Sequence, residues 1–175
     1  MLAMPTHSSL FGVGCSSRRL SIAPNPSDPV ANDELLLRSI DGDLAHGWEN
    51  GKLRLASTSF NDRGMKVSVD RERLQQDLKE SLQRDSDGLA RVVARDVRAI
   101  DLGDAQKKTS IPVDVTPDPL DAPPHPKRNP AHALIAATSE INGSRFQRLK
   151  EKLARLAEKD LVLLPAKYRG AQPPP

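Results

Sequence analysis

The chain has 175 residues, 37% of them hydrophobic and only 3% aromatic, which predicts one domain with a core of Leu, Val, Ile and Ala. Its 26 lysines and arginines nearly balance 23 acidic residues, which argues against a dedicated nucleic-acid binder. The single cysteine excludes an internal disulfide, and no apolar run approaches the roughly 18–20 residues of a membrane span. We therefore expect a cytoplasmic protein that does not contact a membrane.

The first 31 residues are rich in Ser, Pro and Gly and show no sustained periodicity, which predicts a disordered leader. The stretch 1–27 has two arginines and no acidic residue, as transit peptides do, but prolines and glycines would interrupt an amphipathic helix. We favour the leader over a targeting segment. A single domain is expected over residues 32–164, with a C-terminal tail at 165–175.

The domain begins with helix-forming signals. Asn32 is a suitable N-cap, and the acidic residues after it suit the positive end of a helix dipole. The apolar residues of this predicted short helix, which closes at Asp41-Gly42, are Leu35, Leu36, Leu37 and Ile40. A polar segment with His46 and Trp48 then leads to the turn pair Asn50-Gly51.

Two stretches of alternating polar and apolar residues follow, at 52–57 and 65–69, on either side of the turn-forming segment 61–64. This arrangement predicts an antiparallel hairpin. Asp70 is expected to cap a helix that ends at 85–88. The apolar face of that helix, spaced at four residues, consists of Leu74, Leu78 and Leu82.

The next segments are extended. Residues 89–102 fit a helix and a broken strand pair about equally, and their β-branched content favours strand. Residues 111–115 predict an edge strand, because Pro112 cannot donate to a ladder. Six prolines between 116 and 130 predict an extended surface loop.

The last elements are the most regular. Residues 131–137 form the most apolar run and predict a central strand. Ser144 is expected to cap a helix over 144–159, followed by a short strand at 160–164. The apolar stripe of this helix comprises Phe146, Leu149, Leu153 and Leu156. The fold class is therefore α+β, with a small mixed or antiparallel sheet packed by two amphipathic helices.

Most catalytic motifs are absent from the sequence. It has no phosphate-binding glycine loop, GxSxG elbow, HExxH or CxxC, which counts against nucleotide hydrolases, α/β-hydrolases and zinc enzymes. We expect neither a metal nor a cofactor. Segments 37–40, 54–60, 67–70 and 130–133 resemble small bacterial proteins with no established activity, so this resemblance implies no functional residues.

A dispersed set of residues could support acyl or phosphoryl chemistry, which needs a histidine, an orienting carboxylate and a hydroxyl. The candidates are His46, Asp70, His132, Ser57 and Ser59. A structural explanation is stronger for each: Asp70 as a helix cap, the serines as strand-end hydrogen-bonding groups, and His132 as a core histidine bonded to backbone.

Three arginines beside apolar runs, Arg38, Arg54 and Arg71, could together bind an anion, although solvated side chains are the commoner outcome. The rare aromatic residues Trp48 and Phe60 are interpreted as core anchors in preference to partner contacts.

The helix over 144–159 has six basic and two acidic residues, a net charge of +4. Its candidate partner-binding residues are Arg148, Lys152 and Arg155. With the missing catalytic motifs, this helix favours an accessory or adaptor protein that binds a larger protein partner. One alternative is a small enzyme or nucleotide-recognising domain that uses His46, Asp70 and His132 together with the three arginines named above. Another is a nucleic-acid-binding regulator. Convergence of these residues in one cleft would favour the enzyme. An exposed apolar patch would favour the adaptor.

Overall fold

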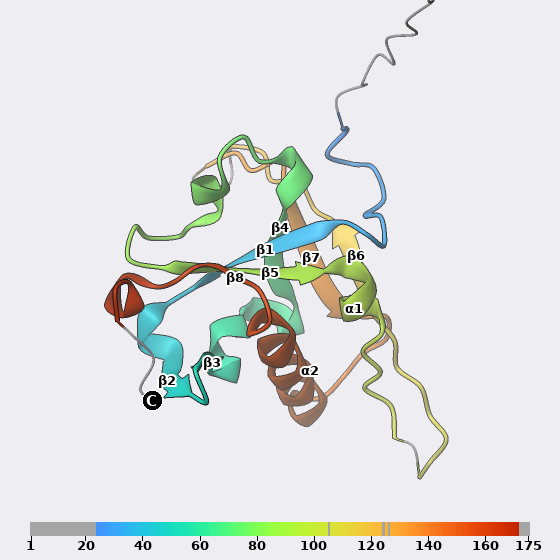
Figure 1. The fold of residues 1–175 in the computed structure, drawn as a ribbon. Coiled ribbons are helices and arrows are strands. Elements are labelled where there is room, and N and C mark those ends of the chain that lie inside the picture. Colours follow the sequence, from blue (N-terminus) through green and yellow to red (C-terminus); the bar gives the residue numbers. More distant parts are fainter. Residues whose placement is uncertain (1–23, 105, 124, 126, 172–175) are drawn as a thin grey trace, which may run out of the picture.

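The computed structural model describes residues 24–104, 106–123, 125 and 127–171 (Figure 1). Its centre is an antiparallel six-stranded sheet in the order β6-β7-β4-β1-β5-β8. The strands of this sheet are β1 (Leu35–Ile40), β4 (Val67–Arg71), β5 (Gly88–Val93), β6 (Val113–Pro117), β7 (His132–Ala137) and β8 (Leu161–Leu163). A separate hairpin pairs β2 (Ala45–Glu49) with β3 (Lys52–Leu55), and the α-helices of the described residues are α1 (Ala94–Arg98) and α2 (Gly143–Ala157). This arrangement is an α+β fold.

Helix α2 covers one face of the sheet (Figure 1). Its buried stripe belongs to the same core cluster as buried residues of β1, β4, β5, β6 and β7, and it includes Phe146, Leu149, Leu153, Ala154 and Ala157. The helix was expected, but its cap is Asn142 and not Ser144. The Asn142 side-chain oxygen accepts a hydrogen bond from the Arg145 N–H at 3.0 Å, while the Ser144 hydroxyl donates to that same oxygen.

The segment 35–40 is a strand, so the predicted first helix is wrong. Strand β1 pairs with β4 on one side and with β5 on the other, and Leu36, Leu37 and Ile40 are at most 1% exposed. A strand that is covered on both faces has a continuous apolar run, and such a run also fits a short helix. Pairing with the two neighbouring strands selects the strand over the helix, and this pairing cannot be recognised from the local sequence.

The predicted hairpin between 52–57 and 65–69 is also wrong. Strand β3 pairs with β2 across Asn50-Gly51, where φ is 51° and 73°, as a tight two-residue turn requires. Strand β4 instead lies between β1 and β7 in the other sheet. Gly64, with φ of 73°, does form a turn, but the turn links the two sheets.

The helix predicted after Asp70 is absent. Asp70 lies inside β4, and the chain then forms two 3-10 helices, η4 (Glu72–Leu74) and η5 (Leu78–Ser81). The three leucines expected on its buried face are only half-buried. Pairing of Asp70 with His132 keeps these residues extended, which removes the start of the helix.

The remaining elements agree in part with the sequence. Residues 88–98 divide into strand β5 and helix α1, where we favoured strand alone. Strand β7 is internal, as predicted, and β6 and β8 lie at the two edges. In the described part of the proline-rich connection between β6 and β7, one isolated bridge joins Leu120 and Asn129.

Residues on both sides of 32–164 are also packed against the rest of the fold. Val30 is buried, and the Arg71 guanidinium donates to the carbonyl oxygens of Pro26 and Asp28, both at 2.8 Å. At the other end Tyr168 is buried. The rest of the expected leader and tail, 1–23 and 172–175, lies outside the described residues. No helix in the described part of the chain has the length and apolar character needed to cross a membrane.

Candidate functional site

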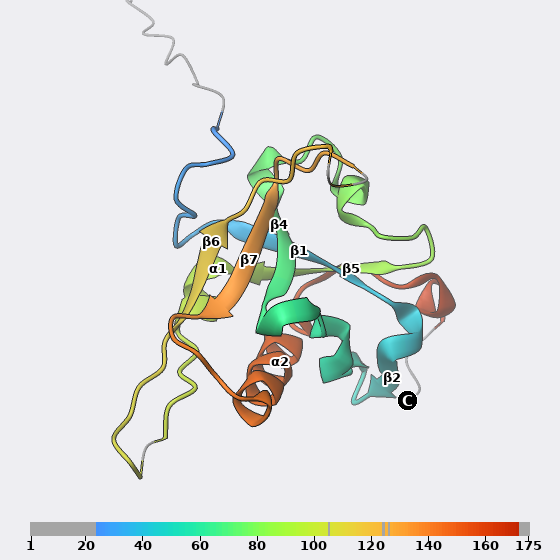
Figure 2. The ribbon, with the colours of Figure 1, turned by 180° about the vertical axis from the view of Figure 1, so that it is seen from behind.

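A polar hollow of about 300 Å³ lies on the sheet face opposite α2. Strand β4 directs Val67 and Val69 to the core, so Ser68 and Asp70 lie on the other face. The β-ladder places Asp70 opposite His132 on β7. In Figure 2 the sheet strands β6, β7 and β4 lie nearer the viewer than β5.

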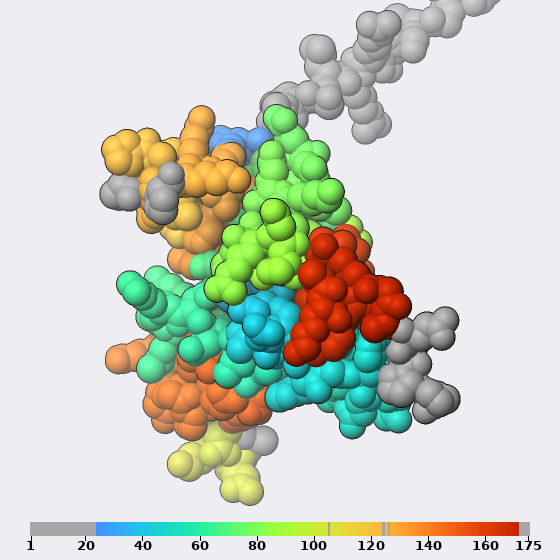
Figure 3. All heavy atoms as spheres, turned by 90° about the vertical axis from the view of Figure 1, so that its left-hand side faces the viewer, coloured from blue at the N-terminus to red at the C-terminus, as the bar shows by residue number. Residues whose placement is uncertain are grey.

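Two connections complete the walls of this hollow. One is the segment 80–83, and the other is the β6–β7 connection, which contributes Leu120 and Asn129. Figure 3 shows these connections side by side, the first green and the second orange. Residues far apart in the sequence therefore meet at one polar surface.

His132 is held in one orientation. Its Nδ1 lies 2.8 Å from the carbonyl oxygen of Asp118 and 3.2 Å from the Asp118 carboxylate, and the residue is only 8% exposed. A carbonyl oxygen only accepts, so Nδ1 carries the hydrogen and donates it. The other ring nitrogen, Nε2, then carries the lone pair, so it can accept a hydrogen bond from a ligand.

Asp70 is also positioned by a neighbour. The Asn129 side-chain nitrogen donates to Asp70 Oδ1 at 2.7 Å, and the Asn129 oxygen accepts from the Ala131 N–H at 3.1 Å. Among the described residues, the second Asp70 oxygen has no hydrogen-bond donor. Asp70 therefore presents one acceptor, next to the orienting amide, on the wall of the hollow.

Arg38 lies under the hollow as a structural brace. Its five N–H groups donate to the Asp62 carboxylate and to the carbonyl oxygens of Ser59 and Ser68. Burial raises the pKa of Asp62, but the Arg38 hydrogen bonds and charge outweigh it and hold that pKa below its ordinary value. No donor of Arg38 is left for a ligand anion.

The other two arginines are also paired within the chain. Arg54 lies 3.3 Å from Glu158 and 3.2 Å from Glu49, and both Arg54 and Glu49 are substantially exposed. Arg71 is 0% exposed and bonds Glu34. The three predicted anion-binding arginines thus pair with three different sets of carboxylates and do not meet at one site.

The catalytic candidates separate into two groups. Asp70 and His132 line the hollow, whereas His46 is exposed on β2. The Ser57 hydroxyl accepts from the side chain of Gln147 on α2. Ser59 is buried, and within the described part of the chain its hydroxyl has no hydrogen-bond partner. The dispersed set is therefore reduced to one carboxylate and one histidine.

The partner candidates also differ in exposure. Phe60 is 1% exposed in the core, so it does not reach the surface. Trp48 packs edge-on against Tyr168, with ring centroids 6.3 Å apart. Of the partner candidates, the three on α2 are exposed, and these are Arg148, Lys152 and Arg155.

Sequence reasoning missed Asp118 and Asn129. Both lie in or beside the proline-rich connection, where no periodicity marks a functional position. The segment Asn129-Pro-Ala-His132 was the available signal, because Asn commonly bonds nearby backbone, as it does here to Ala131.

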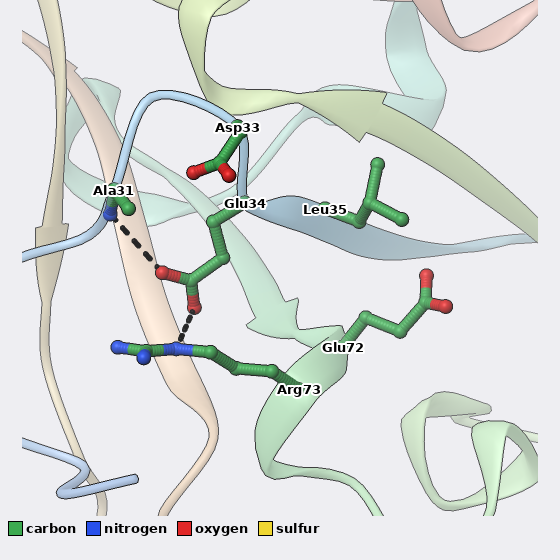
Figure 4. Close-up of a pocket in the computed structure, with 6 residues that line it drawn as sticks. All are labelled: Ala31, Asp33, Glu34, Leu35, Glu72 and Arg73. Carbon is green, nitrogen blue, oxygen red and sulfur yellow. Dashed lines mark hydrogen bonds and ion pairs between the residues drawn. The ribbon is translucent and has the colours of Figure 1, made fainter.

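A second hollow of about 490 Å³ is lined by three acidic residues and Arg73, and Figure 4 shows the ion pair between Glu34 and Arg73. Glu72, on the same wall, is paired with Arg91. Glu34 accepts from the Ala31 N–H, Arg71 and Arg73. Burial raises the pKa of Glu34, but these bonds dominate and hold it below its ordinary value. We therefore interpret this cluster as structural.

Comparison with protein-family models, with curated proteins and with solved structures gives no match to this chain. Within the described residues, no group of three or more His, Cys, Asp or Glu side chains is arranged to hold a metal ion. The chemistry available in the hollow is that of the imidazole, the carboxylates, the amides and the hydroxyls.

Proposed function

We propose that the chain binds a small polar ligand in the hollow at Asp70 and His132, where His132 acts as a general acid or base. The cross-strand pairing of these two residues carries the proposal, because it puts a carboxylate and an oriented imidazole on one wall. Asp118 supports the role of His132 by accepting from Nδ1, which directs Nε2 as the proton-exchanging atom. Of the alternatives considered from the sequence, this proposal corresponds to the small enzyme, but it does not use His46.

The surface of the described residues also supports a ligand site over an apolar docking site. The large hydrophobic residues that it exposes are Leu44, at 37%, and Met65, at 40%. The apolar stripe of α2 is used by the core. This leaves little apolar area for a partner, whereas an accessory protein of the expected kind would present such a patch.

An adaptor role remains a second proposal, supported by one observation. Arg148, Lys152 and Arg155 are exposed on one face of α2 and line a shallow depression with Glu151. An acidic protein partner would complement this face. Charge reversal at the three basic positions should then weaken a complex recovered from cells without changing the melting temperature. Both proposals assume a cytoplasmic protein. Nucleic acid is the least favoured partner.

The ligand proposal can be tested without knowing the ligand. The purified chain is dialysed against a small-molecule extract of bacterial cells, and retained compounds are identified by mass spectrometry. His132→Gln and Asp70→Asn are compared with His46→Gln, a matched control because His46 is exposed and lies outside the hollow. Thermal melts verify that each variant is folded.

We expect the wild type and His46→Gln to retain the same compound, and the two hollow variants to lose it. Retention of nothing by the wild type would refute the proposal. So would retention of the same compound, at the same level, by folded His132→Gln and Asp70→Asn.

A further inference from the structure

The hollow at Asp70 continues into a neighbouring hollow of about 280 Å³, which is distinct from the one at Glu34. Glu80 and Asn129 line both, so the two form one groove. The second part lies between η4 and the β6–β7 connection, with Gln75 on one wall and Lys127 and Arg128 on the other. Gln75 is held by its side-chain bond to the Ser81 hydroxyl, at 3.0 Å. Together the two parts have the size of a small-molecule site.

The two ends of the groove differ in charge. Lys127 and Arg128 are exposed at one end, and Arg128 lies 3.7 Å from Asp121, a pair open to solvent and therefore weak. At the other end the charged groups are the carboxylates of Asp70, Glu80 and Asp118, the last beside His132, and the neutralised Arg38. An anion is therefore favoured at the lysine end and disfavoured at the Asp70 end.

The Asp70 end favours hydroxyl groups over an ammonium group. Its wall contains hydroxyl and amide groups that both donate and accept, among them Ser68 and the Gln83 side chain, whereas the Ser39 hydroxyl is already bonded to Asp87 and to the Gln83 N–H. A ligand hydroxyl also donates and accepts, so it can satisfy Asp70 and these groups together. An ammonium group only donates and would leave the amide donors unpaired.

We propose that the groove binds a phosphorylated polyol, with its phosphate at Lys127 and Arg128 and its hydroxyls at Asp70 and His132. This inference rests on the proposed function, because it assigns a ligand class to the same site. One flexible cation and one guanidinium suit a phosphate, which accepts from several directions. The imidazole Nε2 then faces a hydroxyl that it can hydrogen-bond or deprotonate.

The test uses three probes, ribose 5-phosphate, ribose and inorganic phosphate, with affinities measured by isothermal titration calorimetry on the full chain. Ribose 5-phosphate should bind about tenfold or more tighter than either fragment, because one molecule engages both ends. The double variant Lys127→Gln/Arg128→Gln should lose about tenfold in affinity for ribose 5-phosphate and phosphate and leave ribose unchanged. Asp70→Asn should weaken ribose 5-phosphate and ribose and leave phosphate unchanged.

Glu80 supplies a matched test of charge, because it lines both parts and carries a like charge to the phosphate. Glu80→Gln should raise the affinity for ribose 5-phosphate about two- to threefold, and less at high salt. Its affinity for ribose should not change.

The ligand class is overturned if ribose 5-phosphate does not bind, or binds no tighter than phosphate alone. It is equally overturned if the lysine–arginine double variant binds ribose 5-phosphate as the wild type does. If a compound from the cell extract still depends on His132 in these cases, the site stands and only the ligand class fails. If, in addition, no compound from the cell extract depends on His132, the site itself is refuted as well.

Discussion

Removal of the Arg71 side chain should cost more stability than removal of an exposed arginine. Arg71 is 0% exposed, and its five N–H groups donate to the Glu34 carboxylate and to three backbone carbonyl oxygens. The Glu34 side chain is itself only 3% exposed. Arg71→Ala therefore leaves a carboxylate and several carbonyl groups buried without their main donor.

The expected loss follows from that geometry. Removing one partner of a buried ion pair costs about 3–5 kcal/mol, because the other charge remains desolvated. For a domain of this size, 1 kcal/mol corresponds to about 2–4 °C in melting temperature, so the melting temperature should fall by about 6–20 °C. Arg73 also bonds Glu34 and is substantially exposed, which places the loss toward the lower end.

Urea denaturation at neutral pH measures this loss, and Arg95→Ala is the matched control. Arg95 pairs with Asp96 on the surface, where the two side chains are 72% and 41% exposed, so the control should lose no more than about 0.5 kcal/mol. A third variant, Arg71→Met/Glu34→Met, removes both charges and should be more stable than Arg71→Met alone. A loss below about 1 kcal/mol in Arg71→Ala would refute the reasoning, as would a double variant that is less stable than the single one.

Two further predictions concern pH and packing. The folded pKa of Glu34 lies below its ordinary value of 4.5, so its contribution to stability is present above that pH and is lost as the pH falls through the folded pKa. The unfolding free energies of Glu34→Gln and the wild type should therefore differ most at neutral pH and converge below pH 4.5; a constant difference would contradict this. Leu153→Ala should cost about 2–5 kcal/mol, because Leu153 is fully buried, and Leu78→Ala less than about 1 kcal/mol, because Leu78 is half-buried on a 3-10 turn. Equal losses in urea denaturation would mean that the two leucines are equally packed.

The elements that the sequence predicted correctly have one-sided or long apolar patterns. Strand β7 is the most apolar run, and of the leucines at helical spacing on α2, Leu149 and Leu153 are buried and Leu156 is partly buried. The alternation of Val67 and Val69 with polar residues likewise identified strand β4. These patterns are local, so no partner strand is needed to interpret them.

The elements that were predicted wrongly depend on contacts far along the chain. Leu35-Leu-Leu37 has no period, and Asn32 looks like a cap, yet β4 and β5 pair with both edges of this segment and make it a strand. Around Leu74 and Leu78 the four-residue spacing was real, but β4 extends to Arg71, whose guanidinium bonds the chain near Pro26. Tertiary contacts overrode local propensity at both places.

The candidate site was predictable only as residue types. Asp70 and His132 were named because acid–base chemistry uses them, but only the β4–β7 register places them side by side. The orienting partners Asp118 and Asn129 lie outside any periodic segment. Their positions follow from the path of the β6–β7 connection over the sheet, which no local pattern encodes.

Strand β4 joins the fold and the proposed site through its alternation. Val67 and Val69 face the α2 side and contribute to the core, while Ser68 and Asp70 face the hollow. A polar substitution at Asp70 therefore changes the site without opening the core, which is why Asp70→Asn can report on ligand binding in a folded protein. Arg71, the next residue, lies on the opposite face of β4 from Asp70 and is buried. Its charge is therefore paired with Glu34. The same two-residue period thus makes Asp70 a test of function and Arg71 a test of stability.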